Sequence, residues 1–270
     1  MLCRDYIYSE MLNDVRSSIT DNEISAFEAM LVQCGYDFNC ADAYIRLPGA
    51  TPLPIGFNEA KVLPGPLISR LPTRSREEIY FDLAIPLSKK VLLLCFGGGH
   101  NHTFHLQDSF LPEGWVCVVL AGPDRKPSEL ADAGLSTDRF FTVPSDCYLP
   151  DLINAADCVL GKIGYGFVSE CLATKTPLVY ISRSHWAEEQ FLKSHLESTG
   201  LGVLMILSDF DNGNWEKYLL TAEDINATMK NSDSKIQSGL KAISPDLSTA
   251  ADTICSVLRN MMLSEVSCFN

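Results

Sequence analysis

Short apolar runs alternate with segments of helical periodicity from Lys90 to about Met205. The apolar runs cover residues 91–96, 114–122, 138–143, 158–161, 177–182 and 202–206. Helical segments lie between them over residues 149–156, from about 167, and over 187–199. Continuous apolar strands separated by helices are typical of a parallel sheet that is covered on both faces. The pattern therefore predicts an α/β domain with a Rossmann-like parallel sheet and helices on both faces.

The residues before Lys90 follow a different pattern. An expected first helix carries apolar residues at three- to four-residue spacing, namely Ile24, Phe27, Met30 and Leu31. Gly35 is predicted to end that helix, because glycine readily adopts the conformation that follows a helix. A stretch rich in proline and glycine then predicts an extended linker, and a short helix is expected over residues 75–85.

These patterns divide the chain into four expected regions. They are a helical region over 1–45, a Pro-rich linker over 46–75, a ligand-binding α/β domain over 76–235 and a C-terminal helix within 236–270. Two helix candidates, over 214–230 and 247–263, follow the last predicted strand.

Composition excludes several classes of protein. Of the 270 residues, 46% are apolar and 20% are charged, which predicts a packed core rather than disorder. The formal net charge of −13 argues against a nucleic-acid partner, because binding phosphates requires basic side chains. The sequence contains no run of about 18 apolar residues, so no membrane span is expected. The first residues lack the apolar segment of a signal peptide.

Ten cysteines are spaced irregularly, and no Cys-x-x-Cys pair occurs, so a zinc ribbon is not expected. Several lie inside apolar strands, as Cys95 and Cys117 do, where they act as small buried apolar residues. This use of cysteine is typical of a reducing compartment, and we expect a cytoplasmic location.

Loops that follow strands are the places to look for chemistry, because open parallel sheets bind ligands beyond the carboxyl ends of their strands. The first such loop contains Gly97, Gly98 and Gly99. Glycines let a backbone approach a ligand closely, but the same run also suits a plain tight turn. The residues alone leave both interpretations open.

The second loop, GKIGYGFVSE, leaves a strand at residue 161 and begins a helix. A helix N-terminus presents free N–H groups and the positive end of a dipole, which suit a pyrophosphate. Gly164 and Gly166 would keep the approach open. Lys162 would offset phosphate charge, or it is a solvated surface lysine.

Two polar residues of the same loop have alternative interpretations. Ser169 either donates a hydrogen bond to the ligand or makes a polar contact at the start of the helix. Glu170 suits a pair of sugar hydroxyls, because a carboxylate beside a phosphate would repel it. Alternatively, Glu170 only favours the helix dipole.

A third element, His185-Trp186-Ala187-Glu188-Glu189-Gln190, follows the strand over 177–182. Its acid–amide pair offers acceptors and donors for sugar hydroxyls. Alternatively, it is an exposed helix N-terminus at which acids are favourable. Neither a GxxxxGK[ST] phosphate loop nor a G-x-G-x-x-G fingerprint occurs. The first glycine loop continues into three histidines, His100, His102 and His105. These histidines could bind a metal or act as a base, but exposed surface histidines are the more common case. We therefore expect no metal site and no cofactor.

Together these loops resemble those of glycosyltransferases with two Rossmann lobes, the GT-B type. The C-terminal lobe of that family has a glycine-rich loop, a segment of the form S/K-x-G-x-G-x-x-S-E, and a Gln preceded by an acid or Gln. More narrowly, the chain resembles the glycosyltransferase-like N-terminal region of plant-type L-arabinokinases. This likeness is carried by ADAYIRLPGATPLP, LPEGWVC, LPDLINAADCVLGKIGYGFVSECLATKTPLVYISRSHWAEEQFLKSHLE and NWEKYL, within residues 40–220.

The resemblance implies a role for each matching residue. The diphosphate of a nucleotide-sugar donor would contact Gly97, Gly98, Lys162, Gly164, Gly166 and Ser169. Glu170 matches the acid that binds the ribose hydroxyls, and Glu189 and Gln190 match the pair that holds the donor sugar. The uracil of a UDP-sugar would lie near residues 143–147. The family works without a DxD-bound cation.

The chain also departs from the family. A GT-B enzyme has an N-terminal lobe that holds the acceptor and usually the base, whereas only about 45 residues precede the linker here. Residues 1–45 therefore resemble an incomplete remnant of that lobe, and 76–235 resemble the nucleotide-sugar-binding domain. If the remnant leaves a sheet edge exposed, the chain is expected to form a homo-oligomer.

Two kinds of function fit these observations. The first is a glycosyltransferase that moves a hexosyl or pentosyl group from a UDP-sugar to an unknown acceptor, with an unknown catalytic base. The second is a non-catalytic nucleotide-sugar-binding module, or a truncated L-arabinokinase-like protein without kinase activity, since the chain contains no phosphate loop. An epimerase of the same two-lobed fold is a weaker third, because it too needs the missing lobe.

Overall fold

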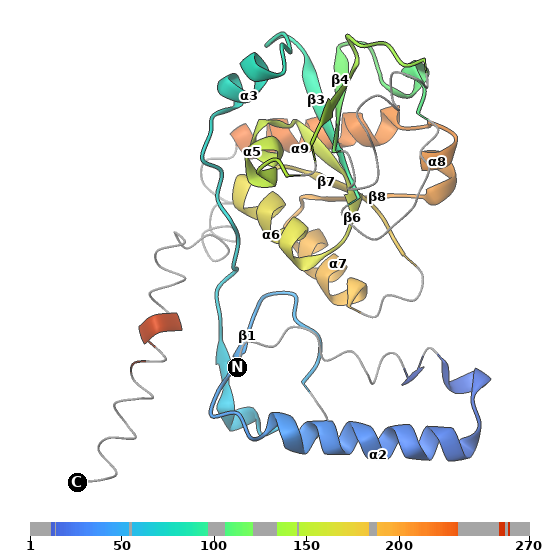
Figure 1. Ribbon diagram of the computed structural model, residues 1–270, viewed down its shortest axis with the longest axis vertical. Helices are drawn as coiled ribbons and strands as arrows, with labels where there is room; N and C mark the ends of the chain where they lie inside the picture. The colour runs from blue at the N-terminus through green and yellow to red at the C-terminus, as the bar shows by residue number, and fades with distance from the viewer. Residues whose placement is uncertain are drawn as a thin grey trace. The chain divides into compact units, whose positions relative to one another are not determined.

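The computed structural model describes residues 12–13, 15–53, 56–96, 106–120, 134–144, 146–183, 188–231, 254–256 and 259. The chain divides into two compact units, which are described separately (Figure 1). The first contains Met1–Ile68, Ser184–His195 and Ile243–Asn270, and the second contains Ser69–Arg183 and Leu196–Ala242.

A six-stranded parallel sheet forms the centre of the second unit. Its strands are β3 (Lys90–Cys95), β4 (Trp115–Leu120), β5 (Phe140–Val143), β6 (Cys158–Lys162), β7 (Leu178–Ile181) and β8 (Gly202–Met205). Their order is β5-β4-β3-β6-β7-β8, and every neighbouring pair is parallel. The six predicted strands are therefore confirmed. From β3 the chain adds β4 and β5 on one side of the sheet. It then returns to the other side of β3, where β6, β7 and β8 follow in order.

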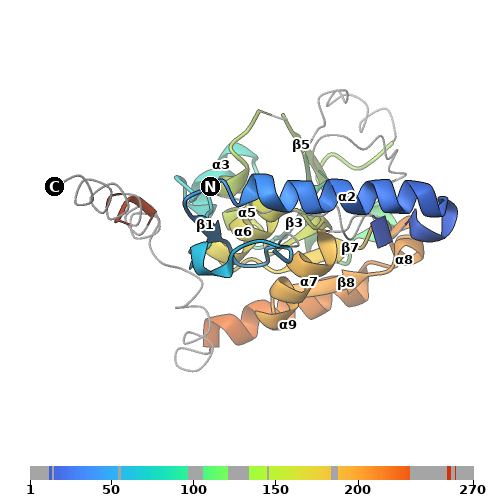
Figure 2. The ribbon, with the colours of Figure 1, turned by 90° about the horizontal axis from the view of Figure 1, so that it is seen from below.

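Helices cover both faces of this sheet, as predicted. On one face lie α3 (Arg76–Asp82), α5 (Leu149–Ala155) and α6 (Tyr165–Thr174), and on the other lie α8 (Leu207–Asp211) and α9 (Glu216–Asn231). Figure 2 shows α9 on the opposite side of the strands from α5 and α6. The helix α7 (Glu189–Ser198) precedes β8, and its residues from Leu196 onward belong to this unit.

The side-chain alternation of the strands explains why both faces are covered, because successive residues of a strand point to opposite faces. Leu92 and Leu94 of β3 join one apolar core with Trp215, which begins the α9 region and is fully buried. Val91 faces the other way, where it packs with residues of α3 and α5 around a gap of only about 10 Å³. A sheet that is apolar on both faces needs both helical layers.

The first unit holds the helix α2 (Asp21–Phe38), the strands β1 (Tyr44–Arg46) and β2 (Val62–Pro64), and the short 3-10 helices η1 (Arg16–Ser18) and η2 (Glu59–Lys61). The side chains of Thr20 and Glu23 cap the start of α2 reciprocally. The Lys61 ammonium donates hydrogen bonds to the carbonyls of Asn39 (2.5 Å) and Ala41 (3.0 Å) just beyond the end of α2. A cation there complements the dipole of the helix.

The prediction that Gly35 ends the first helix is wrong. The helix α2 continues to Phe38, with its cap at Asn39, and Gly35 is buried within it. The extra turn allows Phe38 to pack against the small apolar cluster of Leu12 and Leu31. This gain in buried apolar surface outweighs the roughly 1 kcal/mol by which glycine disfavours a helix interior.

The Pro-rich stretch is extended, as predicted, but it also contains a strand. β1 and β2 form a two-stranded parallel sheet, in which Tyr44 pairs with Val62 and Arg46 with Pro64. Strands of three residues are too short to leave a periodic signal, so the pattern did not reveal them. The four expected regions stay predictions, whereas the two compact units divide this stretch at Ile68.

The helix predicted over 214–230 is confirmed as α9. Most of the helix predicted over 247–263 lies outside the described residues, of which 254–256 and 259 are helical. Within the described part of the chain, no helix has the length and apolar character needed to cross a membrane.

The pairing of β3 with β6 generates a stability prediction. Gly161 lies opposite Cys95, and a Cβ on Gly161 would lie 2.1 Å from the Cys95 carbonyl oxygen and 2.8 Å from Phe167 Cε1. We expect Gly161→Ala to lower the free energy of unfolding by about 2–4 kcal/mol, because the two strands must separate. Urea denaturation followed by tryptophan fluorescence measures this change.

Gly166→Ala is the matched control, because Gly166 is exposed and no described atom lies within 4 Å of its Cβ position. Its free energy of unfolding should stay the same or rise by up to ~1 kcal/mol, since alanine favours a helix. Equal destabilisation of both variants would contradict the packing described for Gly161.

Candidate functional site

The two glycine loops singled out from the sequence follow neighbouring strands. β3 leads to Gly97 and Gly98, and β6 leads to the Gly164 loop; Cys95 and Gly161 pair near the carboxyl ends of the two strands. This is the switch point of the sheet, where the strand order reverses. Open parallel sheets bind ligands at that point. Gly97 and Gly98, together with His100, His102 and His105, lie outside the described residues.

The loop after β6 leads directly into the N-terminus of the helix α6. Gly164 is the N-cap of α6, and no side-chain cap bonds to this end of the helix within the described residues. The Val168 N–H donates to the Gly164 carbonyl at 2.9 Å. The earlier N–H groups of α6 have no intrahelical acceptor, which is the usual state of a helix start. They form an array of donors at the switch point.

Neither packing nor backbone strain requires the glycines of this loop. Gly164 has φ −157° and ψ 148°, which any residue adopts. No described atom lies within 4 Å of the Cβ position of Gly164 or of Gly166. Gly161, in contrast, is demanded by contact with β3. The open space at Gly164 and Gly166 gives a ligand room to reach the helix N-terminus.

Two cationic side chains lie at the carboxyl ends of the strands beside this loop. Lys162 is the last residue of β6, and Arg183 follows β7 and donates a hydrogen bond to the Ile163 carbonyl. Burial lowers the pKa of Lys162, and the nearby positive charge of Arg183 lowers it further. Two positive charges that repel each other suit an anion. The sequence did not reveal Arg183, because this residue lies two positions after β7 and is not part of any recognisable motif.

Ser169 is buried, and its hydroxyl donates to the Gly166 carbonyl at 2.9 Å. This contact within the first turns of α6 is the simpler of the two alternatives for Ser169. Its contact with a donor diphosphate stays a prediction.

Glu170 lies in the second turn of α6 and is only 3% exposed. The dipole of a helix acts mainly on charges in its first turn, so the dipole alternative does not explain Glu170. A buried carboxylate needs a charge partner or several hydrogen bonds. The structure supplies one partner that the sequence did not reveal.

That partner is Arg70, whose Nε lies 2.6 Å from Glu170 Oε1. The Glu170 side chain is 4% exposed and the Arg70 side chain 56%, so the pair reaches from the interior to the surface. The hydrogen bond to Glu170 raises the pKa of Arg70. The two residues are 100 positions apart in the chain. No local pattern links them, and sequence reasoning placed Arg70 in a linker.

Glu189 and Gln190 begin α7, in the part of that helix that belongs to the first unit. Glu189 is buried at 3% exposure, whereas Gln190 is exposed. The structure thus groups Lys162, Gly164, Gly166, Ser169 and Glu170 in one unit. Their association with Glu189 and Gln190 in a single site stays a prediction. Of the residues expected near the uracil, Val143, Pro144, Asp146 and Cys147 are described.

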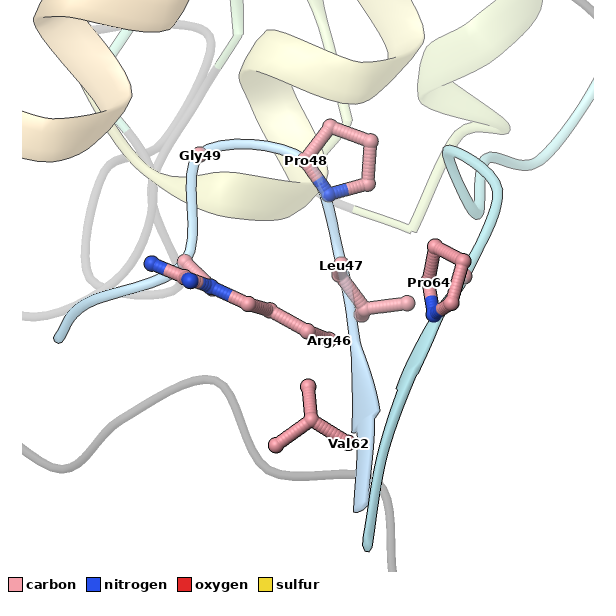
Figure 3. A pocket seen from close by; sticks show the side chains of 8 residues that line it. Arg46, Leu47, Pro48, Gly49, Val62 and Pro64 are labelled. Carbon is pink, nitrogen blue, oxygen red and sulfur yellow. The ribbon is translucent and has the colours of Figure 1, made fainter. Parts of the chain in front are cut away.

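The first unit has an open hollow of about 470 Å³ beside its two-stranded sheet. Figure 3 shows the side chains of Arg46 and Val62 on one side of the strand pair, with the turn of Pro48 and Gly49 above them in this view. The lining is mainly apolar, with Arg46 as its charged member. None of the residues predicted to bind the donor lines this hollow.

Known proteins resemble the chain in both sequence and fold. No family model matches it. L-arabinokinase of Arabidopsis thaliana is 38% identical over 187 residues, which are 69% of this chain and 17% of that protein. The chain therefore spans about a sixth of the length of this relative, and the predicted sequence resemblance is confirmed over that region.

Three solved structures show the fold. The glycotransferase of kitacinnamycin has a TM-score of 0.58 at 14% identity, and covers 94% of this chain and 67% of its own. The calicheamicin glycosyltransferase CalG4 has a TM-score of 0.58 at 16% identity, with coverage of 95% and 66%. A UDP-glucosyltransferase from Polygonum tinctorium has a TM-score of 0.52 at 17% identity, with coverage of 82% and 54%. The chain has the Rossmann-like α/β fold of GT-B glycosyltransferases.

The charges beside the loop generate a second stability prediction. While Lys162 is charged, its burial and its repulsion from Arg183 oppose folding, because they lower its pKa in the folded state. We expect Lys162→Gln to raise the free energy of unfolding at pH 7 by a few tenths of a kcal/mol. The difference should shrink as the pH rises through the pKa of Lys162, where the wild-type side chain also becomes neutral.

Lys90→Gln is the control, because Lys90 forms an ion pair with Glu223 and lies 5.8 Å from the centre of the Trp115 ring. Neutralising it should lower the free energy of unfolding by about 0.5–1 kcal/mol. Thermal and urea unfolding at pH 7 and at pH 10 measure both effects. A loss of stability in Lys162→Gln as large as in Lys90→Gln would contradict the repulsion.

Proposed function

We propose that the carboxyl edge of the sheet at β3 and β6 binds a nucleotide sugar, with UDP-sugars as the donor class. The diphosphate lies against the N-terminus of α6, near Gly164, Gly166 and Ser169, with Lys162 balancing its charge. Gly97 and Gly98, which follow the neighbouring strand β3, also contact the diphosphate. Glu170 accepts hydrogen bonds from the ribose hydroxyls, and Glu189 and Gln190 hold the sugar.

One observation carries the proposal. Gly164 and Gly166 are glycines that neither packing nor backbone conformation requires, at a helix start that lies at the switch point of the sheet. A glycine at position 166 weakens the helix by about 0.5–1 kcal/mol relative to an alanine there. A ligand that needs close backbone approach explains both glycines. The GT-B fold and the similarity to L-arabinokinase support a sugar-related function.

As an enzyme, the protein would transfer a hexosyl or pentosyl group to an acceptor. Rate acceleration would come from orienting the donor and from stabilising the charge of the departing diphosphate. The N–H groups of α6, Lys162 and Arg183 are the groups able to do so. We infer a cytoplasmic location, which eight free cysteines among the described residues support.

The second candidate is a nucleotide-sugar-binding module without catalytic activity. Every residue assigned above serves the donor, and no base or acceptor contact has been assigned. L-arabinokinase activity of the whole relative is not proposed for this chain, because the matched region is 17% of that protein.

Calorimetric titration with UDP and UDP-sugars tests the proposal. Filling the open space with Gly164→Ala and Gly166→Ala together should weaken UDP binding at least ~tenfold, equivalent to about 1.4 kcal/mol, while the protein stays folded. Glu170→Gln should weaken it as well, because the amide carries no charge for the ribose hydroxyls. Glu223→Gln, at the amino edge of the sheet, is the matched control and should bind like the wild type.

The outcomes separate the candidates. Binding without turnover of the donor favours the module, and release or transfer of the sugar favours the enzyme. The absence of UDP binding at millimolar ligand excludes both.

A further inference from the structure

The segment 69–76, called here the strap, is held against the rest of the second unit by polar contacts along its length. Near its middle, Asp151 of α5 accepts hydrogen bonds from the Thr73 N–H at 2.6 Å and the Arg74 N–H at 3.1 Å. At its end, Arg76 forms two hydrogen bonds, of 3.0 and 2.7 Å, to the carboxylate of Asp157. Asp151 is buried at 4% exposure, so the strap is tied to the interior.

The contacts near Arg70 hold its side chain in place. The Tyr148 hydroxyl donates to the Leu71 carbonyl at 3.0 Å, and the Arg70 guanidinium lies 5.4 Å from the centre of the Tyr148 ring. An exposed arginine on a free loop would lose much side-chain entropy on forming an ion pair. The contact with the Tyr148 ring already restricts the Arg70 side chain, which lowers this entropic cost.

The geometry of the pair leaves one oxygen of Glu170 available. Arg70 bonds to Oε1 through Nε alone, at 2.6 Å. Within the described part of the chain, the Oε2 atom of Glu170 has no hydrogen-bond donor. A carboxylate that is fixed at one oxygen presents the other in a defined direction. That arrangement suits a hydroxyl group of a ligand.

We propose that Arg70 is a positioning residue that makes Glu170 selective for ligands with ribose hydroxyls. Arg70 pairs with the buried carboxylate at Oε1 and fixes its plane, and Glu170 Oε2 accepts the hydroxyl hydrogen bond. The inference rests on the proposed function, because it needs a nucleotide at the switch point. It adds a determinant from the strap, outside the strands and loops that form the edge of the sheet.

Removing Arg70 should therefore affect recognition of the hydroxyls more than binding of the phosphates. The experiment measures the affinities of the full chain for UDP and for 2′,3′-dideoxyuridine 5′-diphosphate by calorimetry. In the wild type, the dideoxy compound should bind at least ~tenfold more weakly, because it leaves Glu170 Oε2 unpaired. In Arg70→Ala this ratio should fall to about two or less, while the affinity for the dideoxy compound changes by less than about threefold.

Two further variants keep the test decisive. Arg70→Lys retains the charge but not the Nε contact, and its ratio should lie between those of the wild type and Arg70→Ala. Arg74→Ala is the matched control: it removes an arginine of the same strap, which pairs with Asp82 at 2.6 Å where both side chains are well exposed. Its ratio should equal that of the wild type, and circular dichroism checks that each variant is folded.

The results distinguish the two proposals. Equal weakening of both ligands in Arg70→Ala, or an unchanged ratio, overturns the role of Arg70 and leaves the nucleotide site standing. A wild type that prefers neither ligand also overturns it. Failure of the wild type to bind UDP overturns the proposed function and this inference together.

Discussion

The close pairing of β3 with β6 is the contact on which the rest of the second unit depends. The backbone of Gly161 meets the Cys95 carbonyl so closely that no side chain fits between them. This pairing closes the gap between the two halves of the sheet, which run outward to β5 and to β8. It also places the carboxyl ends of β3 and β6 side by side. The candidate site follows from this packing constraint, because the loop into α6 leaves the sheet at its switch point.

Three buried or largely buried carboxylates attach the strap to this framework. Asp151, Glu170 and Asp157 bind Thr73, Arg70 and Arg76 respectively. Breaking one side of such a pair is costly, because it leaves a charge without compensation in a poorly hydrated place. The strap is thus part of the α/β unit rather than a passive connection. Its arginine at position 70 lies beside the acid proposed to bind the ribose.

Two features at the carboxyl edge of β6 lower the stability of the fold locally. Gly166 weakens the start of α6, and Lys162 and Arg183 repel each other. An anion at the helix N-terminus would relieve the repulsion and use the space at the glycines. Sites that bind or react commonly retain such local costs, and the surrounding structure compensates for them. Here the compensation comes from the apolar layers on both faces of the sheet.

The sequence by itself determined the strands, most of the helices and the loop that leads into α6. These are local properties: apolar runs, helical spacing and glycines next to each other in the chain. It also carried the resemblance to GT-B glycosyltransferases and L-arabinokinase, because the residues of that motif are contiguous. The end of α2 at Phe38 was missed, since burial of Phe38 outweighed the local preference of Gly35.

Only the tertiary structure decided which distant residues meet. The strand order places the carboxyl ends of β3 and β6 together, and folding brings Arg70 to Glu170 across 100 positions. Arg183 approaches Lys162 for the same reason, since β6 and β7 are neighbours in the sheet. A pattern along the chain reports the conformation of each segment. Charge partners across the fold depend on how those segments pack, and no spacing in the sequence encodes that distance.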